Sequence, residues 1–299
     1  ERPLAVFLDS VDQLDGNRAG ALPWLPLVLP RHCYVVVSCQ SDEESPWCIL
    51  KPLRTRGFAE DQFVTTNLLS QRKAEGILSK MLEVDRRALT PEQLRELYAA
   101  VEEQEEGSTA LFLKLAYRFT RRWKSYDAPS RIPRTTHGLI DEVFARLEQY
   151  HGKPLVSHLF AYLECSRNGL SQRELLDLLS TDEVVLKSVL EYHQPPQRRV
   201  PPLVFTRLLD DIQDFLITKY TDNTSLLSWA HTPFRETAAR RYVRGVQARR
   251  AFSAVIADYF DSVLCLIYSD RSIDAHPFHF VTATSTSSSS SSSSSWSPA

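Results

Sequence analysis

The sequence is poor in glycine, and its cysteines follow no regular spacing. Nine glycines in 299 residues favour a helix-rich chain. The five cysteines include no CxxC pair, so reduced thiols in a cytosolic protein are the simplest interpretation. The histidines of HPFH, His276 and His279, have no second ligand pair along the chain and do not predict a zinc site.

Long apolar runs and a strong charge of either sign are also missing. No stretch approaches the ~18 apolar residues of a membrane span, and no secretory signal is present. The formal net charge of −2 gives no reason to expect nucleic acid or an anionic membrane as a partner. Basic residues cluster in Arg118–Lys124 and Arg240–Arg250, which we interpret as solvated helix faces. We therefore expect a cytoplasmic protein.

Two motifs of common enzyme classes are absent from the 299 residues. Without GxSxG, serine-hydrolase chemistry has no nucleophile elbow. Without GxxxxGK[ST], there is no phosphate loop. The stretch HGKPLV at His151–Val156 has Gly-Lys, but it lacks the partner glycine, and Pro154 replaces the hydroxyl residue.

Two apolar runs near the start predict parallel strands. Leu4–Leu8 and Cys33–Gln40 are continuous and β-branched or apolar, which is typical of strands buried inside a parallel sheet. Their separation suits a βαβ-type crossover. A third short strand is predicted at Gln62–Thr66.

From Ser70 the apolar period becomes helical. Thr90, Pro91 and Gln93 form a capping signature for the second helix, and Gly107 is expected to end it. Helices are predicted over Ser70–Glu83, Glu92–Glu105, Thr109–Phe119, Leu139–Tyr150, Leu155–Glu164, Ser171–Leu179, Asp182–Tyr192 and Arg235–Phe260.

The second half of the chain predicts a winged helix. Short helices are followed by two apolar strands, Phe215–Tyr220 and Leu226–Ala230, around a loop at Thr221–Ser225. The would-be recognition helix, Ser171–Ser180, is acidic, which opposes contact with DNA phosphates. The tail, with nine serines at Ser287–Ser295, is expected to be disordered.

Four polar residues are candidates for chemistry. Asp9 ends the first strand, where α/β sheets bind ligands, and could hold Mg²⁺; Asp12 could orient an attacking water. The alternatives are a turn cap for Asp9 and a solvated Asp12. Ser38 ends the second strand and could reach a γ-phosphate or simply form a turn. His231 follows the last strand and could equally be a packed or helix-capping histidine.

Six segments, in order along the chain, resemble a STAND-class P-loop NTPase of the NACHT type. The resemblance is to the vertebrate subfamily in which this module precedes WD or TPR repeats (nephrocystin-type and NACHT-WD-repeat proteins), and it covers roughly Leu4–Phe260. The segments are LAVFLDSVDQL, LPWLPLVLPRHCYVVVSCQ, GSTALFLKLAYRF, RIPRTTHGLIDEVFARLEQYHG, GLSQRELLDLLS and LLSWAHTPFRETAARRYV.

The resemblance implies a role for each candidate. Asp9 matches the Walker B aspartate that handles Mg²⁺, and Asp12 matches the second acidic position linked to hydrolysis. Ser38 matches the sensor-1 region. His231 matches the winged-helix histidine that touches the β-phosphate of bound ADP and acts as a latch.

The sequence departs from the family pattern at several positions. Gln13 stands where a further acid is common, which puts fast turnover in doubt. Cys39 and Gln40 stand where many NACHT proteins carry an arginine. Ala110 replaces the proline of the hinge motif in Gly107–Leu113.

The expected fold is α/β followed by mostly α. We expect the C-terminal part of a NACHT core at 1–67, a helical lid at 68–128, the winged helix at 129–235, the start of a helical repeat region at 236–280, and the tail at 281–299.

The expected function is that of an N-terminally truncated piece of an ADP/ATP-regulated switch. In the intact protein, ATP or ADP with Mg²⁺ would control self-association and protein partners. The chain itself is expected to bind ATP weakly and to be inactive, because it lacks the phosphate loop. The rival is a degenerate, non-enzymatic scaffold, which is favoured if the genomic sequence upstream of Glu1 encodes no GxxxxGK[ST].

Overall fold

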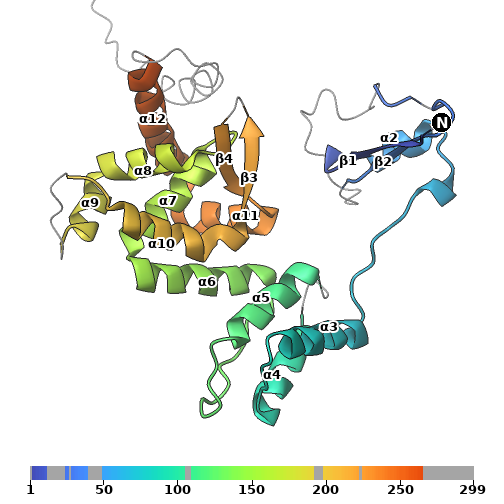
Figure 1. Cartoon of the computed structure of the whole chain (residues 1–299), viewed down its shortest axis with the longest axis horizontal. Helices are drawn as coiled ribbons and strands as arrows, with labels where there is room; N and C mark the ends of the chain where they lie inside the picture. Colours follow the sequence, from blue (N-terminus) through green and yellow to red (C-terminus); the bar gives the residue numbers. More distant parts are fainter. Residues whose placement is uncertain are drawn as a thin grey trace, which may run out of the picture. The chain divides into compact units, whose positions relative to one another are not determined.

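The structure is a computed structural model that describes residues 2–11, 24–26, 28–39, 49–104, 109–191, 198–221 and 224–264 (Figure 1). The chain divides into two compact units, Glu1–Leu68 and Leu69–Ala299. In the part of the chain that is described, no helix is long and apolar enough to cross a membrane.

The first unit contains a pair of parallel strands. β1 (Leu4–Leu8) pairs with β2 (Cys33–Val37), with Leu4 opposite Cys33 and Leu8 opposite Val37. This confirms the prediction of two neighbouring parallel strands. The unit also contains α2 (Leu50–Thr55) and the short 3-10 helix η2 (Glu60–Gln62), neither of which was predicted.

The prediction that these strands are buried on both faces is wrong. Side chains that point one way, such as Leu8, Val35 and Val37, pack on a small cluster that includes Ile49. Side chains that point the other way are exposed, with Phe7 at 74% and Tyr34 at 59%. Alternation of this kind means that the described residues of the unit cover one face of the pair only.

The predicted third strand at Gln62–Thr66 is also wrong. Gln62 ends η2, and residues 63–70 form no strand. Val64 is 89% exposed, while the ring of Phe63 packs on the apolar cluster. A β-branched run becomes a strand only where a neighbouring strand supplies backbone partners, and the described residues supply none here.

The second unit begins with three helices, α3 (Gln71–Val84), α4 (Pro91–Glu102) and α5 (Ala110–Thr120). The capping box predicted at the start of α4 is confirmed, because Thr90 and Gln93 cap each other's backbone N–H groups. The predicted end at Glu105 is wrong, since α4 stops at Glu102. Gly107 lies outside the described residues.

A helical cluster and a hairpin follow. Four helices begin and end near their predicted bounds: α6 (Thr136–His151), α7 (Lys153–Cys165), α8 (Gln172–Thr181) and the shorter α9 (Glu183–Val189). α10 (Pro202–Ile212) was missed, because Pro201 and Pro202 resemble a break although Pro202 occupies the first helical position. The 3-10 helix η3 (Gln213–Phe215) leads from α10 into the hairpin.

The hairpin is the predicted wing with a tighter loop. β3 (Leu216–Thr221) and β4 (Thr224–Trp229) are antiparallel, with Thr221 opposite Thr224. The strands therefore extend into the predicted five-residue loop. Asp222 and Asn223, the predicted turn residues, lie outside the described residues.

The last predicted helix is two helices. α11 (Thr232–Tyr242) is followed by its C-cap residue Val243, and α12 (Gly245–Leu264) begins after a break. The break is sharp because Gly245 has φ +81°, a conformation that glycine adopts without strain. The serine-rich tail lies outside the described residues.

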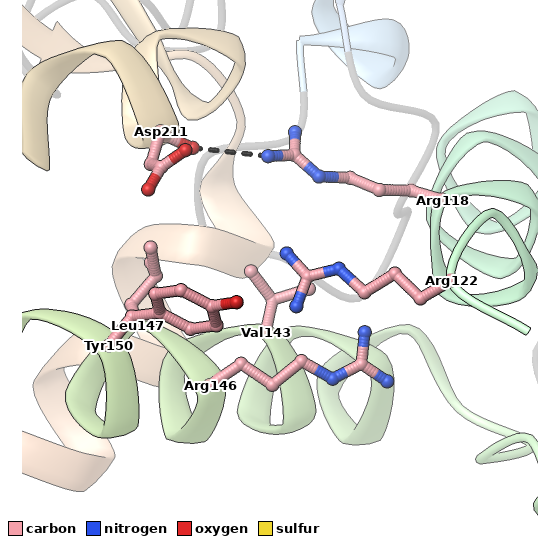
Figure 2. A pocket seen from close by; sticks show the side chains of 7 residues that line it. All are labelled: Arg118, Arg122, Val143, Arg146, Leu147, Tyr150 and Asp211. Carbon is pink, nitrogen blue, oxygen red and sulfur yellow. Dashed lines mark hydrogen bonds between the residues drawn. The ribbon is translucent and has the colours of Figure 1, made fainter. Parts of the chain in front are cut away.

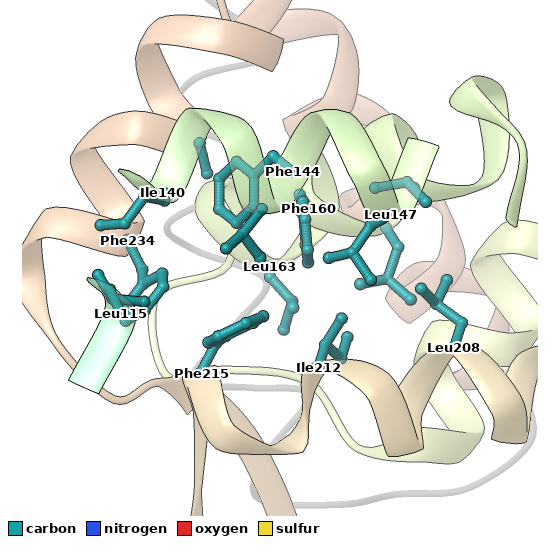
Figure 3. Packing of buried hydrophobic residues seen from close by; sticks show 14 of the residues in the cluster. Leu115, Ile140, Phe144, Leu147, Phe160, Leu163, Leu208, Ile212, Phe215 and Phe234 are labelled. Carbon is teal, nitrogen blue, oxygen red and sulfur yellow. The ribbon is translucent and has the colours of Figure 1, made fainter. Parts of the chain in front are cut away.

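Aromatic side chains hold the winged helix together (Figure 3). The rings of Phe144 on α6 and Phe160 on α7 lie 4.6 Å apart, and those of Phe215 and Phe234 lie 4.8 Å apart. Trp229 of β4 packs 5.2 Å from Phe160. Because each large ring buries much apolar area, this contact network fixes the hairpin and α11 against α6 and α7.

The turn between α7 and α8 adds a backbone bridge to the hairpin. Leu170 and Leu227 exchange two hydrogen bonds of 3.1 and 2.8 Å. Gly169 precedes the bridge with φ +92°, and a Cβ there would lie 2.3 Å from the carbonyl oxygen of Leu227. Only glycine fits this approach without displacing the strand.

Candidate functional site

The structure brings together two of the predicted site residues, Asp9 and Ser38, at the carboxyl edge of the parallel pair. The Ser38 hydroxyl donates a hydrogen bond to the Asp9 carboxylate, and the backbone N–H of Ser10 donates to the Ser38 hydroxyl at 2.8 Å. The N–H of Val11 donates to the Ser38 carbonyl at 3.0 Å. The two side chains are thus held in one place by the backbone that continues both strands.

This edge offers oxygen ligands that are open to solvent. Asp9 and Ser38 are both exposed, and a carboxylate with a hydroxyl is the kind of donor set that Mg²⁺ accepts alongside water and phosphate oxygens. Asp12 lies outside the described residues, so its place at this edge stays a prediction. Among the described residues, no group of three or more His, Cys, Asp or Glu is arranged to hold a metal ion.

His231 lies at the start of α11, immediately after β4. It occupies the N-cap position, but its side chain makes no capping hydrogen bond. Its ring stacks on Phe234 with 6.3 Å between centroids and 28° between planes, and the residue is exposed. The imidazole nitrogens are therefore accessible to a ligand, and the capping alternative is wrong.

The hinge segment begins α5. Ala110, which stands in the place of the family's proline, is the first residue of the helix, and the Thr109 hydroxyl accepts from the Phe112 N–H at 3.2 Å. The threonine cap thus starts the helix without a proline.

The second unit contains a concave feature that was not predicted. Three arginines line a hollow between α5, α6 and α10 (Figure 2). The sequence predicts a solvated helix face for the basic cluster that includes Arg118 and Arg122. Arg118 lies in α5 and Arg122 lies two residues beyond its end, but only the packing of α6 against α5 shows that Arg146 joins them. We call this feature the arginine hollow; its lining is Arg118, Arg122, Val143, Arg146, Leu147, Tyr150 and Asp211.

Other buried ionisable groups of this unit are paired and serve the fold. Burial disfavours ionisation of Glu148, but hydrogen bonds from Arg241 and Tyr242 outweigh it and hold the pKa of Glu148 below its usual value. Glu164 is buried between Arg235 and Arg249. These pairs link α11 and α12 to α6 and α7, and removal of one partner would leave an uncompensated charge.

A third network links α7 to the start of α9. The Asp182 carboxylate accepts hydrogen bonds from Tyr162, at 2.9 Å, and pairs with His158. Burial opposes ionisation of Asp182, yet its partners, His158 above all, hold the pKa of Asp182 below its usual value. The same carboxylate caps α9 at the N–H of Val184.

Comparison with known proteins matches part of the chain to a described family of domains. Residues 128–249 match the model described as "NWD1-like, winged helix-turn-helix domain". The match covers α6 to α10, the hairpin and α11, and it ends in the first turns of α12. The chain is a relative of the NACHT and WD repeat-containing proteins. The resemblance found in the sequence is thereby confirmed.

The relatives extend over most of the chain. The human NACHT domain- and WD repeat-containing protein 1 is 32% identical over 261 residues, which is 86% of this chain and 16% of the relative. The human NACHT and WD repeat domain-containing protein 2 is 29% identical over 265 residues, 87% of this chain and 15% of the relative. Mouse telomerase protein component 1 is 24% identical over 266 residues, 85% of this chain and 10% of the relative.

The chain therefore spans about one sixth of the length of the NACHT and WD repeat relatives that it matches. No solved structure matches the chain. The comparisons establish an NWD1-like winged-helix module, and the winged-helix part of the predicted fold is confirmed. A complete P-loop NTPase sheet is not established by one pair of parallel strands.

Proposed function

We propose that this NWD1-like module is part of a nucleotide-regulated switch of the NACHT type, in which ADP or ATP with Mg²⁺ controls association with protein partners. The observation that carries the proposal is the meeting of Asp9 and Ser38 at the carboxyl edge of two parallel strands. This edge is where open α/β sheets bind ligands. The relatives' names, with NACHT and WD repeat domains, support the same class of protein.

In this proposal Asp9 is the metal residue. Its exposed carboxylate is oriented by the Ser38 hydroxyl, and one or two carboxylates are what Mg²⁺ commonly takes from a protein when phosphates and water fill its other positions. Bound Mg²⁺ would supply charge compensation for the phosphates of the nucleotide. Asp12 is the proposed neighbour that orients water.

His231 is the proposed residue that senses the β-phosphate of ADP. Two observations support it: the imidazole is exposed, and its stacking on Phe234 fixes the ring at the start of α11 without using the nitrogens in a cap. A histidine that reports on an anion can act as a switch because its charge responds to its surroundings. In this proposal, replacement of His231 would remove a contact that is made in the ADP-bound state only.

The second candidate is a scaffold without nucleotide chemistry. It is favoured by Cys39, which follows Ser38 where the family commonly has arginine, and by Ala110, the first residue of α5 in place of proline. In this case the module would position the repeats of a longer protein for binding to partners. Both candidates include protein partners and self-association in the cytoplasm, and neither includes nucleic acid.

The experiment compares nucleotide binding with matched variants in a protein of the relatives' length. Isothermal titration with MgATP and MgADP should show affinity lowered at least about tenfold, or about 1.4 kcal/mol, by Asp9→Asn. The matched control is Asp61→Asn, an exposed carboxylate in η2 of the same unit, which should leave binding unchanged. His231→Ala should weaken ADP more than ATP.

Three results would favour the scaffold instead. They are no saturable nucleotide binding, equal effects of the Asp9 and Asp61 variants, or equal effects of the His231 variant on ADP and ATP. The 299-residue chain by itself is expected to bind ATP weakly or not at all. Sub-micromolar affinity for ATP in this chain would contradict the need for a phosphate loop.

A further inference from the structure

The arginine hollow concentrates positive charge where helices of different parts of the second unit meet (Figure 2). Arg118 projects from α5, and Arg122 follows two residues after its end. Val143, Arg146, Leu147 and Tyr150 lie at spacings of three and four residues, so they share one face of α6. The hollow encloses only about 30 Å³, so a ligand would lie against its open face rather than inside a closed cavity.

One wall of the hollow is fixed by its own partners. Arg118 donates to the Asp214 carboxylate at 2.6 Å and to the Asp211 carbonyl oxygen at 3.1 Å, and its guanidinium lies over the Phe215 ring. The Asp211 carboxylate pairs with His151 at 2.7 Å. The carboxylates of Asp214 and Asp211 therefore already have a hydrogen-bond partner each, Arg118 and His151.

The other two arginines are not compensated in this way. Within the described residues, neither Arg122 nor Arg146 makes a hydrogen bond or an ion pair with a carboxylate. Burial lowers the pKa of Arg146, the positive charge of Arg122 lowers it further, and Glu142 on the preceding turn of α6 acts in the opposite direction. The Arg146 guanidinium rests on the Phe119 ring at 4.5 Å, which holds it in place.

We propose that the arginine hollow binds a small polyphosphate anion through the guanidinium groups of Arg122 and Arg146 and the hydroxyl of Tyr150. A guanidinium presents a planar fork that binds phosphate oxygens in pairs. Two such forks with Arg118 behind them match a ligand with more than one phosphate group. Such an anion would also neutralise the repulsion between Arg122 and Arg146, and it would link the end of α5 to α6.

The residues of the hollow belong to the second unit, whereas Asp9 and Ser38 belong to the first. The proposal therefore does not depend on the nucleotide switch. Its ligand is defined by charge and by phosphate geometry rather than by a base or a sugar. Inorganic tripolyphosphate is the simplest probe of that chemistry.

The test is isothermal titration of sodium tripolyphosphate into the 299-residue chain, at low salt and without Mg²⁺. We expect saturable binding to one site, and Arg122→Gln and Arg146→Gln should each weaken it about tenfold or more. Arg173→Gln on α8 is the matched control, since it removes the same charge from a side chain that is 89% exposed and is not part of the hollow. It should change affinity less than twofold.

A melting curve of the free protein separates binding from folding. Arg122→Gln should leave the Tm unchanged or raise it, because it removes a repulsion, while it abolishes most of the rise in Tm that tripolyphosphate causes in the unmodified chain. Arg146→Lys keeps the charge but not the fork and should retain part of the affinity. Absence of saturable binding, or equal weakening by Arg173→Gln, would overturn the proposal. So would a phosphoserine peptide that binds through these arginines when tripolyphosphate does not.

Discussion

Replacement of Gly169 by alanine is the sharpest test of the winged-helix packing. The backbone at Gly169 has φ +92°, and a Cβ would lie 2.3 Å from the Leu227 carbonyl oxygen. The left-handed conformation alone costs a residue with a Cβ about 1–2 kcal/mol. Displacement of the strand would further weaken the two backbone hydrogen bonds between Leu170 and Leu227, at about 1 kcal/mol each.

The free energy of unfolding should therefore fall by about 3 kcal/mol or more. For a unit of this size, each kcal/mol lowers Tm by about 2–4 °C, so we expect a decrease of about 6–12 °C. The assay is thermal unfolding followed by circular dichroism at a helix wavelength. Hydrogen exchange at the Leu227 amide should report the loss of its bond to Leu170.

Gly245 is the matched control. It also has a positive φ, +81°, but a Cβ there meets nothing within 4 Å. Gly245→Ala should show only the conformational cost of about 1–2 kcal/mol. If the two alanine variants melt at the same temperature, the close approach of the α7–α8 turn to β4 is wrong.

Three further predictions concern stability and reactivity. Gly76→Ala, within α3 where a Cβ meets nothing within 4 Å, should raise the free energy of unfolding by about 1 kcal/mol; a lower Tm would contradict the helix there. Asp182→Asn should destabilise the fold by about 1.5–3 kcal/mol at pH 7. Because the pKa of Asp182 is depressed in the folded state, the difference in stability from the unmodified chain should shrink as pH falls below about 4. Denaturant titrations that show a difference independent of pH would refute the role of the charge. Burial raises the pKa of the Cys165 thiol to about 11, so alkylation by iodoacetamide at pH 8, mapped by mass spectrometry, should be much slower at Cys165 than at the partly exposed Cys33.

Local chemistry was enough to predict most of the helices. Caps such as Thr90 with Gln93 and Ser171 with Glu174 act within one turn, so the information lies in adjacent residues. The strand-end position of Asp9 and Ser38 followed equally from the pattern, because the carboxyl ends of parallel neighbours meet at one edge. The resemblance to NACHT proteins rested on the order of such segments.

The predictions were wrong where the structure of a segment depends on contacts with distant parts of the chain. Gln62–Thr66 has the composition of a strand, but no described neighbour offers it a backbone partner. The apolar run at Leu4–Leu8 predicted burial, yet Phe7 is exposed because the described residues cover one face of the strand pair. Intrinsic preference does not specify a partner, so neither outcome could be determined locally.

The sequence by itself determined most of the helix starts, the wing, the resemblance to NACHT proteins and the strand-end position of Asp9, since each depends on spacing along the chain. Only the tertiary structure decided the arginine hollow and the tight contact at Gly169. Arg122 and Arg146 meet because α6 packs on α5, and Gly169 meets Leu227 because the hairpin folds back on the α7–α8 turn. Charges and carbonyl groups that are far apart in sequence acquire their energetic effect only when packing brings them within a few ångströms of each other.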